Sequence, residues 1–113
     1  MIEQYSFGSI IISEKRYTSD LKIINGAIIP NWWRKNGHSV DVNDVADILN
    51  AEPDYLIIGS GSSCLMKVTD RLRQHLVDIG VEVIVEPTFK AVEIFNQMYI
   101  DGKKVVGGFH LTC

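Results

Sequence analysis

The chain has 113 residues, of which 46% are hydrophobic and 22% charged, a composition typical of one globular domain that folds without a metal or disulfide. Its formal net charge of -3 argues against binding to a nucleic-acid backbone, and no apolar run approaches the roughly 20 residues that span a bilayer. We therefore expect a single domain over residues 1–113 that neither binds nucleic acid nor inserts into a membrane.

The two cysteines and the N-terminal residues indicate in which cellular compartment the protein is located. Cys64 and Cys113 lack the closely spaced companion of a zinc or redox motif, which predicts two reduced thiols. The residues after Met1 have neither a signal-peptide nor a transit-peptide pattern. Together these observations predict a cytoplasmic protein that begins at Met1.

The N-terminal third favours β structure. The segment Tyr5–Trp33 is rich in isoleucine and aromatic residues and is interrupted by several turn signals. The strongest of these is Asn25-Gly26, which predicts a hairpin between strands at Leu21–Ile24 and Ala27–Ile29.

From residue 41 onward, helical and strand patterns alternate. Asn43 is expected to cap a short helix that ends before Pro53, and Tyr55–Ile58 is apolar throughout, as in a buried parallel strand. Apolar residues at helical spacing then predict an amphipathic helix over Ser63–Ile79, with an inner face of Leu65, Val68, Leu72, Leu76 and Ile79.

The C-terminal third continues the alternation. Val81–Val85 is predicted to be a strand, and Lys104–Leu111 is predicted to be the last strand. Between them we expect a helix with Thr88 as its N-cap. The inward face of this helix is predicted to consist of Ala91, Val92, Phe95 and Met98. The two crossovers favour parallel pairing, although a linker as short as Asp101-Gly102 also permits an antiparallel return. The sequence thus predicts an α/β core with a β-rich N-terminal addition.

The first candidate site is the glycine turn after the strand at Tyr55–Ile58. Gly59, Ser60, Gly61, Ser62 and Ser63 precede a predicted helix start, where free backbone N–H groups favour a carboxylate or phosphate. The alternative is a plain tight turn before a serine-capped helix. A dinucleotide site is disfavoured because Cys64 replaces the third glycine of the fingerprint, and no cofactor is expected.

Cys64 is a candidate nucleophile at this predicted helix start. Thiol chemistry would need a base, and only His38 or His110 could approach it. The alternative, which we favour, is a small buried residue beneath the turn. A zinc site from His38, Cys64, His110 and Cys113 lacks ligand spacing, so no metal is expected.

Two further segments combine unusual residues. Arg34 follows Trp32-Trp33 and could clamp a carboxylate or phosphate beneath a tryptophan; alternatively one tryptophan covers the core while the other stacks on Arg34. Gly107-Gly108 lies in the last predicted strand, where glycine is unfavourable. Two glycines there indicate that another group approaches the backbone of this strand closely.

Several blocks of this chain together resemble one family of small domains. They are Phe7-Gly8 with Tyr17, Trp32-Trp33-Arg34 with Gly37-His38, Gly59-Ser60-Gly61, Thr88 with Ala91 and Asn96, and the terminal His110-Leu111-Thr112-Cys113. The family includes a mitochondrial complex I assembly factor, the adipogenesis-associated domain-containing protein and many uncharacterised bacterial and archaeal stand-alone members. Gly107-Gly108-Phe109 departs from the small or aliphatic residues usual there.

The resemblance implies a compact three-layer α/β domain with a mixed central sheet and an extra β-rich N-terminal part. It implies no established reaction, and it favours a role as a partner in complex assembly. The family blocks place candidate site residues at the carboxyl end of the sheet, where open α/β folds bind ligands: Trp33, Arg34, His38, Gly59, Gly61, Thr88, His110 and Thr112.

Three classes of function follow. The first is a protein-interaction or complex-assembly module, so that the partner is another protein. The second is a binder of a small anionic ligand at Gly59–Ser63, and the third is an enzyme that uses Cys64. We favour the first class because the sequence contains no complete catalytic set.

Overall fold

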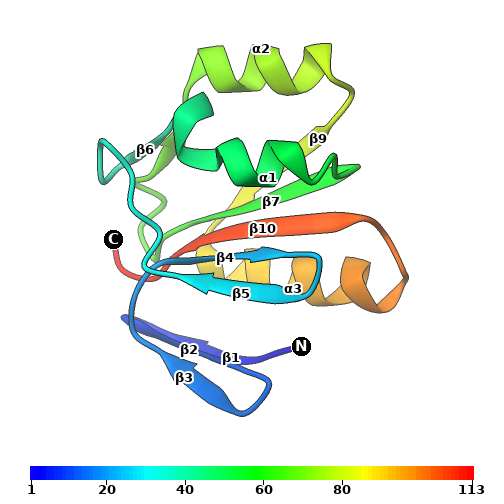
Figure 1. Ribbon diagram of the computed structural model, residues 1–113. Coiled ribbons are helices and arrows are strands. Elements are labelled where there is room, and N and C mark those ends of the chain that lie inside the picture. Colours follow the sequence, from blue (N-terminus) through cyan, green and yellow to red (C-terminus); the bar gives the residue numbers. More distant parts are fainter.

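A five-stranded mixed sheet forms the centre of the computed structural model, which describes residues 1–113 (Figure 1). In spatial order its strands are β5 (Ala27–Pro30), β4 (Leu21–Ile24), β10 (Val105–His110), β7 (Tyr55–Ser60) and β9 (Glu82–Glu86). β10, β7 and β9 are parallel, whereas β4 is antiparallel to both β10 and β5. The last strand is therefore parallel to one neighbour and antiparallel to the other, which answers the question left open by its short linker.

The predicted hairpin is confirmed. β4 and β5 pair in register from Leu21 opposite Pro30 to Ile24 opposite Ala27. Asn25 and Gly26 have φ values of 51° and 79°, the two positive angles that a type I′ turn requires.

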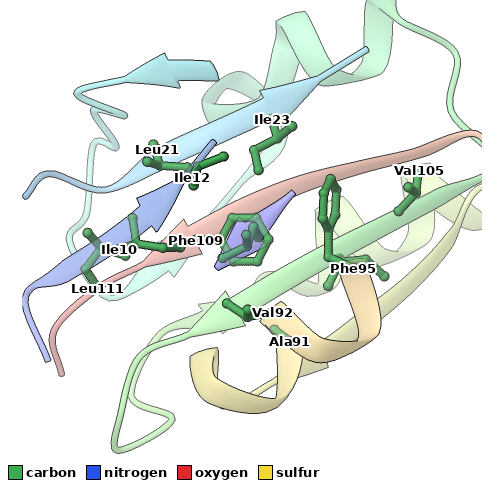
Figure 2. Packing of buried hydrophobic residues seen from close by; sticks show 12 residues of the cluster. Ile10, Ile12, Leu21, Ile23, Ala91, Val92, Phe95, Val105, Phe109 and Leu111 are labelled. Atoms are coloured by element: carbon green, nitrogen blue, oxygen red, sulfur yellow. The ribbon is translucent and has the colours of Figure 1, made fainter. Parts of the chain in front are cut away.

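One face of the sheet is covered by the N-terminal strands and one helix. β1 (Ile2–Ser6), β2 (Ser9–Ile12) and β3 (Lys15–Tyr17) form a separate antiparallel sheet, which lies with α3 (Thr88–Ile100) below the central sheet in Figure 1. Between these layers lies a core of buried apolar side chains, in which the rings of Phe95 and Phe109 meet edge to face with centroids 5.7 Å apart (Figure 2).

Asn96 connects α3 to the N-terminal sheet. Its side chain accepts a hydrogen bond from Ile2 N at 2.9 Å and donates one to Ile2 O at 2.7 Å. These are the bonds that a neighbouring strand would otherwise provide to the edge residue of β1.

The opposite face is covered by helices. A 3₁₀ turn, η1 (Val42–Val45), leads into α1 (Ala46–Asn50), and α2 (Asp70–Asp78) lies above it in Figure 1. They bury a second apolar cluster against the sheet. The structure is thus a three-layer α/β domain with a mixed central sheet and additional N-terminal strands, as expected. The longest helix, α3, has 13 residues, and none of the helices combines the length and apolar character needed to cross a membrane.

The two glycines of β10 permit close packing. A Cβ atom on Gly108 would lie 2.8 Å from the ring of Trp32, and one on Gly107 would lie 2.6 Å from the ring of Phe109. Two carbon atoms that are not bonded cannot come this close, so any side chain at either position would clash with a ring. The expectation that another group closely approaches the backbone of this strand is therefore confirmed.

The predicted helix over Ser63–Ile79 is wrong in its first half. α2 begins only at Asp70, with Thr69 as its N-cap, and Cys64 has a φ of 58°, which a right-handed helix excludes. Lys67–Val68 is instead the short strand β8, paired with β6 (Ser39–Val40). Leu65 is half exposed rather than inward-facing.

Two helix caps also differ from the prediction. Asp41, not Asn43, caps η1, in a capping box with Asp44. Thr88 is the first helical residue of α3 rather than its N-cap, a position taken by Pro87. The hydroxyl of Thr88 therefore remains available for contacts with the sheet.

Candidate functional site

The candidate residues come together at one end of the sheet. β5, β10, β7 and β9 all finish at this end, so the segments that follow them and the β1–β2 turn lie near one another (Figure 1). We call this surface the loop face and define it as residues 7–8, 31–38, 61–66, 87–89 and 111–113. The hydrogen bond from Gly8 N to Leu111 O, 2.8 Å long, attaches the β1–β2 turn to it.

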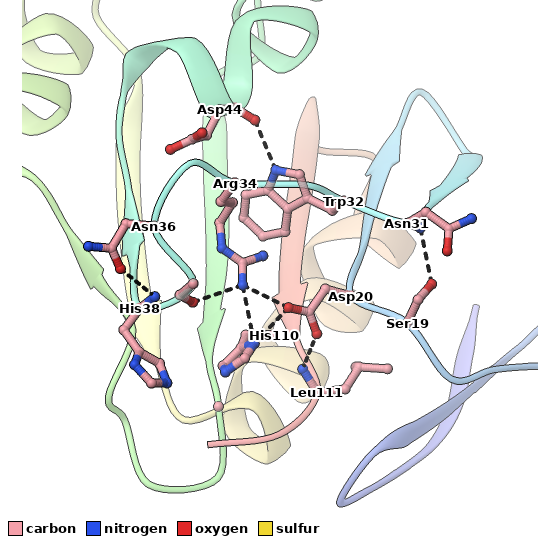
Figure 3. A network of polar contacts seen from close by, with 12 residues as sticks. Ser19, Asp20, Asn31, Trp32, Arg34, Asn36, His38, Asp44, His110 and Leu111 are labelled. Atoms are coloured by element: carbon pink, nitrogen blue, oxygen red, sulfur yellow. Dashed lines mark hydrogen bonds and ion pairs between the residues drawn. The ribbon is translucent and has the colours of Figure 1, made fainter.

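A buried polar network around Asp20 and His110 connects two of its segments, 31–38 and 111–113 (Figure 3). Asp20 Oδ2 accepts hydrogen bonds from Arg34 Nη2 at 2.8 Å and from His110 Nδ1 at 2.7 Å, and Asp20 Oδ1 accepts one from Leu111 N at 2.8 Å. Arg34 Nη2 also donates to Gly37 O at 2.9 Å. The carboxylate that Arg34 clamps therefore belongs to the protein itself.

Asp20 is held in its ionised form by this network. Burial alone would raise the pKa of its carboxyl group, but the hydrogen bonds from His110, from the backbone of Leu111 and from Arg34 outweigh that effect and leave the pKa below its ordinary value. A carboxylate with three donors at this distance balances the buried guanidinium.

Several atoms of the network have no hydrogen-bond partner. Arg34 is 9% exposed and His110 is 6% exposed, and Arg34 Nε, Arg34 Nη1 and His110 Nε2 are buried without one. Trp32 compensates part of this deficit, since its ring stacks on the guanidinium at 4.6 Å. Because a carboxylate oxygen accepts, the contact at 2.7 Å assigns an N–H to His110 Nδ1, facing Asp20.

The remaining residues of the Trp32–His38 segment have separate positions. Trp32 both packs in the core and stacks on Arg34, combining the two roles that the sequence left to different tryptophans. Trp33 points to solvent, and His38 lies with its ring edge to face against His110, with centroids 6.0 Å apart.

The glycine turn does not form the predicted helix N-terminus. Ser62 and Ser63 lie in a turn seven or more residues before α2, so the helix that follows them in the sequence does not begin there. A Cβ atom on Gly61 would lie only 2.6 Å from the carbonyl carbon of Cys113, and Ser62 N donates to Thr112 O at 2.7 Å. The terminal segment of the chain therefore packs directly against this turn.

Thr88 is the centre of this turn. Its hydroxyl accepts a hydrogen bond from Gly61 N at 2.9 Å and donates one to His110 O at 2.6 Å. A Cβ atom on Gly59 would lie 3.0 Å from the same hydroxyl oxygen, so the glycine allows α3 to approach β7. Ser60, opposite His110 in the sheet, donates from its hydroxyl to Glu86 O at 3.1 Å.

Cys64 differs from its predicted environment. It is partly exposed rather than buried beneath the turn, and no hydrogen bond connects its Sγ atom to an imidazole. The arrangement therefore shows no activated thiol. Among His, Cys, Asp and Glu side chains, no group of three or more is placed to hold a metal ion.

Asp20 is the residue that sequence reasoning missed. Its partners lie 14, 90 and 91 residues away, and no motif surrounds it. The only available signal was indirect: a buried arginine requires a carboxylate, and Arg34 had no predicted one.

Comparison with known proteins places the chain in a family. The model of the family described as "Protein of unknown function (DUF498/DUF598)" matches residues 2–110. A solved protein named MT938 is 26% identical, with a TM-score of 0.83 over 100% of this chain and 98% of its own.

Two more distant structures share the fold alone. The conserved hypothetical protein PH1505 from Pyrococcus horikoshii OT3 is 23% identical, with a TM-score of 0.85 over 100% of this chain and 99% of its own. A protein from Bartonella henselae described as an outer membrane protein is 19% identical, with a TM-score of 0.85 over 99% and 94% of the two chains. The expected membership of a family of small α/β domains is thus confirmed: the chain belongs to the DUF498/DUF598 family.

Proposed function

We propose that this domain is a protein-interaction module, used in the assembly of a complex, and that it contacts its partner through the loop face. The observation that carries the proposal is a set of large apolar side chains exposed there. Phe7 is 62% exposed, Trp33 77%, Leu65 50% and Phe89 61%. Each of these side chains comes from a different segment of the chain. Hydrogen bonds between the residues that follow the strands hold these segments at one end of the molecule.

The loops that carry these side chains are fixed in advance. Phe89 follows Thr88, which is bonded to both Gly61 and His110, and Trp33 lies between Trp32 and the clamped Arg34. A rigid exposed aromatic residue loses little conformational entropy on binding, and tryptophan is enriched among the residues that dominate binding energies. This combination favours a docking role over a purely structural one.

Charge favours a particular kind of partner. Lys35 lies two residues beyond Trp33, Lys67 two residues beyond Leu65, and neither forms an ion pair within the chain. Lys35 belongs to the loop face and Lys67 directly follows one of its segments, so both place positive charge at this surface of a chain whose net charge is -3. These lysines complement a protein surface that carries acidic side chains around an apolar patch. The resemblance to a family with an assembly factor points in the same direction.

The test is a pair of single variants. The chain is immobilised and exposed to a lysate of its source cells, and bound proteins are identified by mass spectrometry. Trp33→Ala should lose at least one captured protein that Ile100→Ala retains, because Ile100 is 73% exposed but lies at the far end of α3. Capture should also weaken as salt increases, as expected for an acidic partner.

A photo-crosslinking residue supplies the second readout. Placed at position 33, it should form a crosslink to the same captured protein, while at position 100 it should form none. Equal capture by wild type, Trp33→Ala and Ile100→Ala, with no position-specific crosslink, would contradict the proposal. Circular dichroism of each variant provides the control for folding.

A further inference from the structure

A cavity of about 460 Å³ opens at the margin of the loop face, with which it shares Cys64, Met66 and Pro87, on the side of the sheet covered by α2. It lies where the parallel strands β7 and β9 end, the position at which open α/β sheets hold ligands. Gly61, against which the terminal segment packs, does not line this cavity. Its volume lies within the range of small-molecule sites.

One wall of the cavity is apolar. Met66 and Val68 come from the segment around β8, and Val85 and Pro87 come from the end of β9 and the start of α3. Met66 and Val68 are themselves buried, so this wall is fixed by the core beneath it. Such a surface accommodates a short hydrocarbon body.

The remaining lining is polar and carries positive charge. Lys67 and Arg73 line the cavity, and neither has a carboxylate partner within ion-pair distance. The one acidic residue in the lining, Glu86, is partly neutralised by Lys90 Nζ at 3.8 Å. Two unpaired cations in a concave site attract an oxyanion, and the guanidinium of Arg73 suits bidentate contact with a carboxylate or phosphate.

We propose that this cavity binds a small organic anion, with a carboxylate or phosphate head against Lys67 and Arg73 and a short hydrocarbon body against Met66 and Val68. No carboxylate of the protein lies within ion-pair distance of Lys67 or Arg73. The inference stands whether or not the loop face binds a protein.

The test uses simple probes and nuclear magnetic resonance. Ethanoate, butanoate, hexanoate and butyl phosphate are titrated separately into ¹⁵N-labelled protein at constant ionic strength. The amide signals of Lys67, Arg73 and Glu86 should shift and saturate. Affinity should increase about two- to fourfold for each added methylene, because the apolar wall removes it from water. Comparing butanoate with butyl phosphate determines which head group is preferred.

Matched variants on α2 locate the binding. Arg73→Gln should weaken hexanoate binding about fivefold or more. Arg71→Gln, an exposed position on the same helix that does not line the cavity, should leave it unchanged. Lys67→Gln gives a second test, and a dispersed spectrum confirms that each variant folds.

Cys64 provides an independent readout because it also lines the cavity. In a Cys113→Ser background, saturating hexanoate should slow the alkylation of Cys64, and sodium chloride at the same ionic strength should not. Shifts that fail to saturate below about 20 mM with every probe, or equal effects of Arg73→Gln and Arg71→Gln, would overturn the inference.

Discussion

Gly61 should be the glycine whose replacement by alanine is most damaging, because its backbone is left-handed and its neighbour is a main chain. Its φ is 97°, and a Cβ atom would lie 2.6 Å from the carbonyl carbon of Cys113 and 2.7 Å from Thr112 O. A side chain can rotate away from such a contact, whereas the backbone of the terminal segment must move as a whole.

The magnitude follows from three contributions. A left-handed non-glycine residue costs about 1–2 kcal/mol. Overpacking against an ordered group costs about 1–3 kcal/mol. Loss of the hydrogen bond from Ser62 N to Thr112 O, 2.7 Å long, removes about 1 kcal/mol. Gly61→Ala should therefore lower the free energy of unfolding by about 3–6 kcal/mol.

Gly102→Ala is the matched control. Gly102 also has a positive φ, 78°, but no heavy atom lies within 4 Å of its Cβ position. Only the conformational contribution remains, so its cost should be about 1–2 kcal/mol. Urea denaturation followed by circular dichroism measures both. If the two variants lose the same stability within about 0.5 kcal/mol, the close approach of the terminal segment to Gly61 does not contribute, and the reasoning fails.

Three further predictions concern the polar contacts. Asp20→Asn should cost about 3–5 kcal/mol, since it leaves Arg34 buried without a carboxylate. Because the pKa of Asp20 is lowered by folding, its stabilisation should be complete above the unfolded value near pH 4 and disappear as the pH falls through the folded pKa. Urea midpoints between about pH 7 and 3 should show this loss in the wild type and a shallower profile in Asp20→Asn; parallel profiles would contradict it. Thr88→Val should lower the free energy of unfolding, measured in urea, by about 2–3 kcal/mol because both hydrogen bonds of the hydroxyl are lost. Thr88→Ser keeps the hydroxyl and should lose less than half as much stability. Equal losses in the two variants would exclude the hydrogen bonds as the cause. Asn96→Ala should cost about 1–2 kcal/mol and speed hydrogen exchange at Ile2 N, whereas unchanged exchange there would show that α3 does not hold β1.

The parts of the fold that were predicted correctly are those determined by local chemistry. Asn25-Gly26 adopts the two positive φ values that its residue types favour, so the hairpin follows from two residues. The strands β7, β9 and β10 were placed to within two residues because each is a short, largely apolar run; β7 and β10 are buried inside the sheet, and β9 at its edge is partly buried.

The first half of the predicted helix failed because the same spacing fits another structure. Leu65, Val68 and Leu72 are separated by three and four positions, but Val68 is buried by strand pairing with Val40 and Leu72 by the true helix. Leu65 belongs to neither and is exposed. A contact with residues nearly 30 positions earlier decided the conformation, and helical periodicity alone does not contain that information.

The candidate site was predictable in position but not in chemistry. Glycines, Thr88 and His110 at strand ends indicated the end of the sheet at which the candidate residues converge. What fills that end is Asp20 and the terminal segment, which reach it through the pairing of β4 with β10. Arg34 therefore forms its ion pair with Asp20 of the same chain. From the sequence, the carboxylate of a bound ligand was an equally good partner.

The position of β10 in the sheet has a consequence for synthesis on the ribosome. Of the five strands of the central sheet, β10 comes last in the sequence, yet it lies in the middle, between β4 and β7. Until residues 105–110 have left the ribosome, the hairpin and the β7–β9 pair have no strand to join them, and the inner edges of both remain unpaired. Formation of the native sheet must therefore be a late event, and until then the nascent chain exposes strand edges that can pair with other chains.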